Sequence, residues 1–282
     1  MSILSPQELV RSDSSLFTLP KVFHELQSAL QNPEISFNEI GKIISHDPSL
    51  SARLLKIVNS SFYGFESQVD TLTHALTIVG IDQLSDLAMA TQVIHQFKGI
   101  PSVLFSMEKF WRHSIACGLA AKTLAQMHEE SNAERFYLAG ILHDLGRLVV
   151  LHVEPALAKE TFLASKSNYE NICLSEQTVM GFDHGEVGGE LLRLWKLPPR
   201  LVEAVAFHHF PEGAGEYSKE ASIVHTADFL AHHLSFVSDA EFSEAHLHND
   251  SWNILDMDPE KLEFLKSEVE SQFESISQMF LS

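Results

Sequence analysis

The chain has 282 residues, 45% hydrophobic and 20% charged, which is enough for one large globular domain or two packed ones. Lys and Arg number 19 against 38 Asp and Glu, and the resulting charge of −19 argues against a broad nucleic-acid surface, which needs clustered cations. Cys117 and Cys173 are too few for a disulfide framework, and we find neither a signal peptide nor an apolar run of about 20 residues. We therefore expect a cytoplasmic protein that makes no contact with membranes.

The apolar residues recur with helical spacing along most of the chain, and we find no convincing run of alternating strands. Asp47-Pro48 provides a helix N-cap and a first-turn proline, and Gly80 is typical of a helix end. Helices are expected over residues 37–44, 48–58, 71–79, 82–97, 110–127, 134–152, 154–166, 171–180, 185–196, 199–210 and 221–234, and from 259 onward. The predicted fold class is all-α.

A break at Gly99-Ile100-Pro101 divides the predicted helices into two packed bundles. No linker near this break is long or polar enough for the two halves to move freely. The polar stretch 235–252 is the best candidate for a loose connection, and a last amphipathic helix follows it.

Metal-ligand side chains gather in the second half of the chain, which is rich in histidine; the whole sequence has 16 histidines. They fall on separate predicted helices, so helix packing can bring them to one point. The candidates are His113, His143, Asp144, His184, His208, His209 and Asp228.

The apolar surroundings of the two candidate aspartates, Asp144 and Asp228, argue for a bound cation. His143-Asp144 lies within AGILHDLGRLVVL and Asp228 within SIVHTADFLA, so we expect buried side chains at both places. A buried carboxylate is costly unless it is paired or bound to a cation. Imidazole and carboxylate ligands without a thiolate suit iron, manganese, zinc or nickel.

The spacing of His113, His143-Asp144 and Asp228 resembles the H…HD…D motif of the HD superfamily of metal-dependent phosphohydrolases. His184 and His208-His209 resemble the additional histidines of the dinuclear HD-GYP branch. The segments LPKVFHELQ, IGKIISHDPSLSARLLKIVNSSFYG and LTHALTIVGIDQLSDLAM resemble the HDOD family, the HD-related output domain of bacterial signalling. HDLGRL and GFDHGEVGGELLRLWKLPPRLVEAVAFHH continue this resemblance.

The resemblance implies an HDOD domain over residues 15–235, with an N-terminal helical half over 15–100 and an HD-like half over 101–235. Residues 1–14 would form a tail, and 236–282 a polar connection and C-terminal helix. The chain lacks a GYP signature and carries Phe210 and Lys109 where HD-GYP enzymes carry glutamates. Arg147 replaces the lysine that follows the HD glycine.

Two functions remain open at this point. The first is a phosphohydrolase with one or two divalent ions, iron or manganese before zinc or nickel, in which metal-bound hydroxide attacks a phosphoester. Asp144 would touch both ions, and Arg147 would hold a substrate phosphate unless it is a surface arginine. The substrate would be a small phosphoester or nucleotide. The second is a non-catalytic scaffold that binds an unidentified signalling protein and keeps a structural or vestigial metal.

Several other polar residues are expected to lie outside the metal site. His46-Asp47 also spells HD, but Pro48 makes Asp47 an N-cap. Asn59 is interpreted as a structural residue at a helix end. His225 is either an outer partner of the ligands or exposed, and His232-His233 are predicted to belong to a polar surface.

Overall fold

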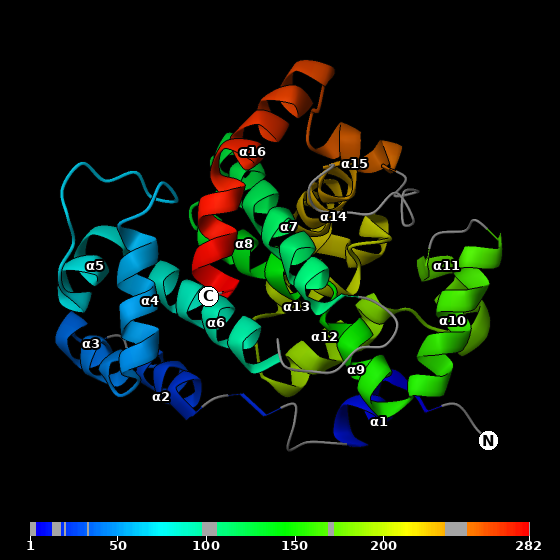
Figure 1. Cartoon of the computed structure of the whole chain (residues 1–282), viewed down its shortest axis with the longest axis horizontal. Coiled ribbons are helices and arrows are strands. Elements are labelled where there is room, and N and C mark those ends of the chain that lie inside the picture. The colour runs from blue at the N-terminus through cyan, green and yellow to red at the C-terminus, as the bar shows by residue number, and fades with distance from the viewer. Residues whose placement is uncertain are drawn as a thin grey trace.

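The computed structural model describes residues 4–12, 18–19, 21–32, 34–97, 106–168, 172–234 and 247–281. Every regular element within these ranges is a helix (Figure 1), which confirms the predicted all-α class.

The N-terminal half consists of four short helices packed in sequence, of which α4 and α5 also pack against a longer helix, α6. These helices are α2 (Lys21–Leu30), α3 (Phe37–Ser45), α4 (Pro48–Val58), α5 (Leu72–Val79) and α6 (Ile81–Phe97). The Asp47 carboxylate accepts the backbone N–H groups of Ser49 and Leu50, both at 2.9 Å, which confirms its role as the N-cap of α4. Gly80 ends α5 with a φ of 105°, a conformation that favours glycine.

The second half is arranged around one long helix, α7, which packs against α8 and α14. Its helices are α7 (Met107–Met127), α8 (Ala133–Leu142), α9 (Leu145–Val153), α10 (Pro155–Asn168), α11 (Ile172–Met180), α12 (His184–Leu194), α13 (Pro199–Ala206), the 3₁₀ helix η1 (Pro211–Tyr217) and α14 (Ser218–His233). A Cβ added at Gly140 would lie 2.6 Å from the Cα of Gly118. The backbones of α7 and α8 therefore meet directly at two glycines.

Two helices end earlier than the apolar pattern predicts. The predicted helix 134–152 is broken at His143-Asp144 into α8 and α9, and α13 ends at Ala206 rather than near residue 210. At the first break the imidazole Nδ1 of His143 donates to the carbonyl of Gly140 at 2.7 Å. This side-chain bond competes for the carbonyl that a continuing helix would offer to its own backbone, which the apolar pattern cannot reveal.

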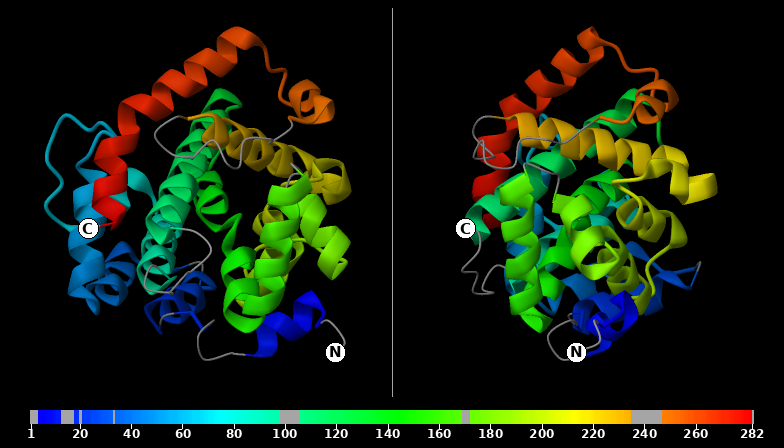
Figure 2. Two further views of the ribbon diagram at one scale, coloured as in Figure 1. Left: turned by 45° about the vertical axis from the view of Figure 1, so that its right-hand side comes forward. Right: turned by 90° about the vertical axis from the view of Figure 1, so that its right-hand side faces the viewer.

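Helices at both ends of the chain cover the two halves. Residues 6–12, expected within a tail, form α1 (Pro6–Ser12), which packs against α9 and α12 because Leu9 and Val10 bury their side chains there. α15 (Asn249–Ile254) begins within the stretch 235–252 that was expected to be a loose connection and ends two residues beyond it. α16 (Pro259–Leu281) runs along α7 and reaches α4 and α6 (Figure 2). The predicted break at 99–101 lies outside the described residues, so the boundary there stays a prediction.

A buried lysine joins the loop after α4 to the second half. The ammonium of Lys122 donates to the carbonyl of Phe62 at 2.8 Å and lies 3.3 Å from the centroid of the Phe62 ring. It is also 3.7 Å from a carboxylate oxygen of Glu134. In the same loop the Asn59 side chain exchanges hydrogen bonds with the backbone of Val69, at 2.7 and 2.8 Å, which bears out its structural role.

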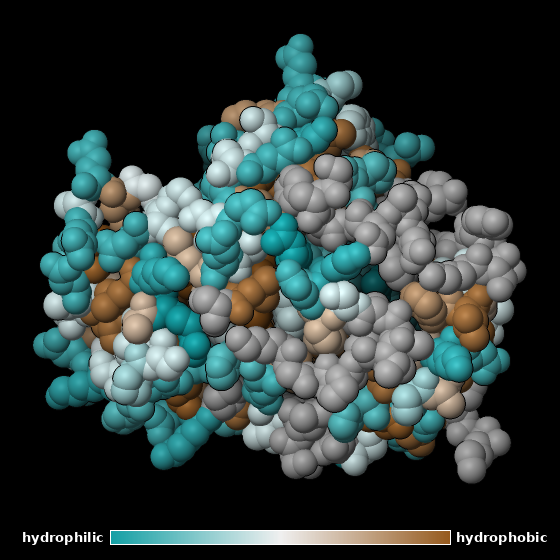
Figure 3. All heavy atoms as spheres, viewed as in Figure 1, coloured by the Kyte–Doolittle hydropathy of each residue, from teal (hydrophilic) through white to brown (hydrophobic). Residues whose placement is uncertain are grey.

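One helical stretch among the described residues, Ala133–Val153, is long and apolar enough to cross a membrane by length and composition. Its apolar window is 83% buried inside the fold, as is usual for a core helix. The face shown in Figure 3 is mostly hydrophilic where the chain is described, with apolar side chains scattered between polar ones.

Candidate metal centre

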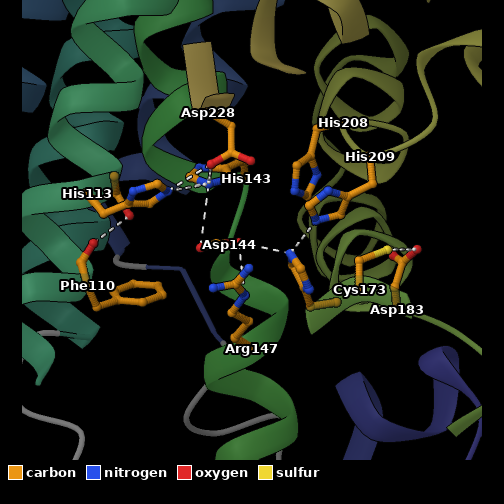
Figure 4. Close-up of polar contacts among 12 residues, drawn as sticks. Phe110, His113, His143, Asp144, Arg147, Cys173, Asp183, His208, His209 and Asp228 are labelled. Atoms are coloured by element: carbon orange, nitrogen blue, oxygen red, sulfur yellow. Dashed lines mark hydrogen bonds and ion pairs between the residues drawn. The ribbon is translucent and has the colours of Figure 1, made fainter. Parts of the chain in front are cut away.

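The structure brings all seven predicted ligands together in the second half. They come from α7, the break between α8 and α9, the first residue of α12, the turn after α13, and α14. Six of them expose at most 8% of their surface, and His209 is partly exposed although its candidate ligand atom is buried. Figure 4 shows His113, His143 and Asp228 on one side, His208 and His209 on the other, and Asp144 between them.

The first ligand cluster consists of His113, His143 and Asp228. The Oδ1 atom of Asp228 lies 2.9 Å from Nε2 of His113 and 3.4 Å from Nε2 of His143. The two Nε2 atoms are 3.3 Å apart. Three ligand atoms of two chemical types thus face one point, as a cation site requires.

The second ligand cluster consists of His184, His208 and His209. The Nε2 atoms of His184 and His209 are 2.9 Å apart, and one ligand atom from each of the three residues lies within 4.8 Å of the others. This cluster contains no carboxylate of its own.

Asp144 lies between the two clusters. Its Oδ2 atom is 3.5 Å from Nε2 of His143, and its Oδ1 atom is 2.9 Å from Nε2 of His184. One oxygen therefore faces each cluster, so this carboxylate is placed to contact a cation in either of them.

Hydrogen bonds on the far side of three imidazoles fix their orientation. His143 and His208 donate from Nδ1 to the backbone carbonyls of Gly140 and Val205, each at 2.7 Å. His184 donates from Nδ1 to the Glu176 carboxylate at 2.6 Å. Because these bonds occupy Nδ1, Nε2 is the ring atom that faces the cluster, as in metal-binding histidines.

The two aspartates are held in the ionised form. Burial alone would raise the pKa of Asp144, but Arg147, His143 and His184 outweigh it and hold that pKa well below its usual value. Burial is likewise outweighed at Asp228, where His232, His113 and His143 keep the pKa well below its usual value.

The imidazoles of the second cluster differ in their protonation. Burial, followed by repulsion from His143 and His184, lowers the pKa of His208 to about 3, so His208 is neutral at neutral pH. Burial also lowers the pKa of His184, but Glu176 and Asp144 outweigh it and raise that pKa to about 9. A cation bound by His184 would therefore have to displace a proton.

The residues present fit a divalent cation. The Nε2 atom of His208 is buried and has no hydrogen-bond partner among the described residues, which is costly unless something binds there. The ligand set of imidazoles and carboxylates is the one expected from the sequence, and it suits iron, manganese, zinc or nickel.

Arg147 is not the surface residue that one interpretation of the sequence allowed. Its side chain is 18% exposed, and its Nε atom lies 3.2 Å from Oδ1 of Asp144. The guanidinium therefore approaches the carboxylate that separates the two clusters.

Two further residues at the site were missed by the sequence analysis, and a third was left undecided. His232 was wrongly predicted to be a surface residue: its side chain is 13% exposed and its Nε2 lies 3.4 Å from Oδ1 of Asp228. The helical spacing of four residues from Asp228 is the signal that could have found it. Glu176 carried no such signal. His225, left undecided, is buried and donates to the carbonyl of His208 at 2.7 Å.

His46 and Asp47, which also spell HD, lie outside the metal centre as expected. The His46 side chain is 68% exposed and lies 3.3 Å from Glu25, while Asp47 caps α4.

Comparison with known proteins places this chain in a family. The sequence model of the HDOD domain matches residues 16–211. An uncharacterised protein of Treponema pallidum (strain Nichols) is 28% identical over 220 residues, which are 77% of this chain and 42% of that protein. The chain thus spans less than half the length of this relative.

Two solved structures share the fold over nearly the whole chain. A Shewanella amazonensis SB2B protein, provisionally named a phosphohydrolase, is 26% identical with a TM-score of 0.73 and covers 96% of both chains. An HDOD domain protein of unknown function from Geobacter sulfurreducens is 20% identical with a TM-score of 0.72, over 98% of this chain and 96% of its own. With the family match extending over well above half of its residues, this chain belongs to the HDOD domain family.

Proposed function

We propose that this chain is a signalling-type HDOD protein that hydrolyses a phosphoester at a divalent-metal centre. The observation that carries the proposal is the position of Asp144, with one oxygen toward each of two buried ligand clusters. The name of the Shewanella amazonensis relative supports the same class of reaction. Iron or manganese is the proposed metal, and zinc or nickel the alternative.

The charges at the site favour cations together with an anionic substrate. Asp144, Asp228 and Glu176 are three carboxylates opposed by the guanidinium of Arg147, so two negative charges remain once cations have displaced the protons of the imidazoles. One divalent ion balances them, and a second leaves an excess of positive charge. A phosphate group would neutralise that excess.

When bound, divalent cations supply a water nucleophile of lowered pKa and stabilise the charge that develops on the phosphate. The chain would hold them through the Nε2 atoms of the histidines and the carboxylates of the two aspartates. Arg147 is the residue we assign to the substrate phosphate, because a guanidinium binds two phosphate oxygens at once and this one is partly exposed beside the site.

One observation favours the alternative, a scaffold with a structural or vestigial metal. Arg147 lies 3.2 Å from Asp144, and His113 lies 2.9 Å from Asp228, so each buried carboxylate has a positive or hydrogen-bonding neighbour without a cation. In that case the helical surface would bind a signalling protein, in the cytoplasm, and catalysis would be absent.

Elemental analysis of the purified protein, after reconstitution with each of the four metals, tests the metal centre, and a phosphodiesterase screen tests catalysis. Asp144→Ala should lower metal content most, because its carboxylate faces both clusters. His46→Ala is the control and should leave metal content unchanged. Circular dichroism checks that both variants fold.

A wild type that stays free of metal, or equal metal loss in both variants, would refute the metal centre. Bound metal without hydrolysis of any phosphoester tested would refute the proposed catalysis and favour the alternative function as a scaffold.

A further inference from the structure

Glu176 is a buried carboxylate behind the second ligand cluster. It lies on α11 and only 5% of its surface is exposed. Its Oε2 atom accepts two hydrogen bonds from the same residue: the Nδ1–H of His184 at 2.6 Å and the backbone N–H of His184 at 2.9 Å. The carboxylate therefore fixes both the position of His184 and the direction of its ring.

His143 and His208 are oriented in a different way. Their Nδ1 atoms donate to backbone carbonyls three residues earlier, which carry no net charge. A carboxylate partner makes the opposite nitrogen of an imidazole a stronger ligand than a carbonyl does. His184 is thus the better electron donor of these three.

The second cluster needs such a donor because it has no carboxylate of its own. Its three members are imidazoles, whereas the first cluster includes Asp228. The acidic oxygen that faces the second cluster, Oδ1 of Asp144, is only 3.2 Å from the positive Nε of Arg147. This contact weakens the attraction that Asp144 offers to a second cation.

We propose that Glu176 is the positioning residue that gives the second cluster its affinity for a cation, by supplying negative charge through His184. The inference rests on the proposed function, since it assigns the two clusters to two ions. It also divides the ligands unequally: besides the shared Asp144, the first ion would have Asp228 as a direct ligand, whereas the second would have Glu176 acting only through His184.

The variant Glu176→Gln separates the charge of this residue from its shape. The amide oxygen of glutamine can accept both bonds from His184, so the fold and the ring position should be kept while the negative charge is lost. We expect the second ion to bind about 10- to 100-fold more weakly, the usual loss for an outer partner of a metal ligand, and the first ion to bind as before.

Glu186→Gln is the matched control. Glu186 lies on α12 two residues after His184, is exposed, and accepts a capping hydrogen bond from the backbone of Asp183 at 3.3 Å. Glutamine can keep this bond too, so the control removes one negative charge close to His184, from α12 instead of α11, without changing a residue that contacts a ligand atom.

Calorimetric titration of the metal-free proteins with Mn²⁺ measures how many ions bind and how tightly. Electron paramagnetic resonance distinguishes a coupled Mn²⁺ pair from a single ion, and neither measurement depends on catalysis. Two ions in wild type and Glu186→Gln, with selective weakening of the second in Glu176→Gln, would support the inference.

Two equally tight ions in Glu176→Gln would overturn it, as would a wild type that binds one ion. A wild type that binds none of the four candidate metals would instead refute the proposed function.

Discussion

Replacing Gly146 by alanine should disturb the metal centre without changing any ligand. Gly146 lies at the start of α9, where this helix packs against α12. A Cβ at this position would lie 1.9 Å from the carbonyl oxygen of His184 and 2.8 Å from the backbone nitrogen of Gly188. Both atoms belong to the backbone, so no side-chain rotation can relieve the contact.

The size of the effect follows from these distances. Real Cβ contacts are almost never shorter than 3.0 Å, so α12 must move away from α9 by about 1 Å. His184 would move with it, and its 2.9 Å approach to Asp144 would be lost. Overpacking of this kind costs about 1–3 kcal/mol of unfolding free energy, which corresponds to roughly 2–4 °C in Tm for each kcal/mol.

Gly41→Ala is the control for this variant. Gly41 also lies in a helix and is buried, but the nearest atom to an added Cβ would be 3.5 Å away, an ordinary contact. Alanine should therefore stabilise α3, by up to about 1 kcal/mol. Thermal unfolding and Mn²⁺ titration measure both variants. A Gly146→Ala variant with the Tm of the wild type and an unchanged affinity for the second ion would refute the packing argument.

Two further predictions concern buried charges away from the metal centre. Burial raises the pKa of Asp86 to about 7 despite the hydrogen bond from Asn132, so the native state keeps a proton that the unfolded chain releases, and stability should fall as pH rises from about 4 to 7. Asp86→Asn should abolish this fall and raise the unfolding free energy at pH 8 by about 1–2 kcal/mol, which is less than the full pKa shift implies because the residue is partly exposed. Urea titrations at several pH values measure the unfolding free energy, and a variant with the pH profile of the wild type would contradict the prediction. Lys122→Met leaves the buried Glu134 without its ammonium partner and should lower the unfolding free energy by about 3 kcal/mol, and the added change Glu134→Gln should restore part of this loss. Chemical denaturation of the single and double variants measures both effects, and equal stability of the two would contradict the prediction.

The sequence indicated which residues gather at the centre because their residue types are unusual in their surroundings. A histidine and an aspartate in the middle of AGILHDLGRLVVL stand out from an apolar pattern, and the family resemblance joins them to distant histidines. The structure brings these residues together as expected, although their role as ligands stays a prediction.

Residues that complete the site by packing alone were not predictable. Glu176 lies in the short helix ICLSEQTVM, where a glutamate among polar neighbours is normally exposed. Its hydrogen bonds to His184, at the start of α12, place it inside the fold. The break at His143-Asp144 was missed for a related reason, since a periodicity of apolar residues records which face is buried and not where the backbone turns.

His184 shows how the fold and the metal centre depend on the same contacts. Its place at the start of α12 is fixed by the Asp183 cap, by the backbone contact with Gly146 and by the bonds to Glu176. Gly146→Ala moves the ligand while keeping every charged residue of the site, and Glu176→Gln removes one charge while keeping the ligand in place. If geometry and charge are both needed, both variants lose the second ion, but only Gly146→Ala also lowers the Tm of the metal-free protein. A similar drop in Tm for both variants would mean that Glu176 serves the fold rather than the metal.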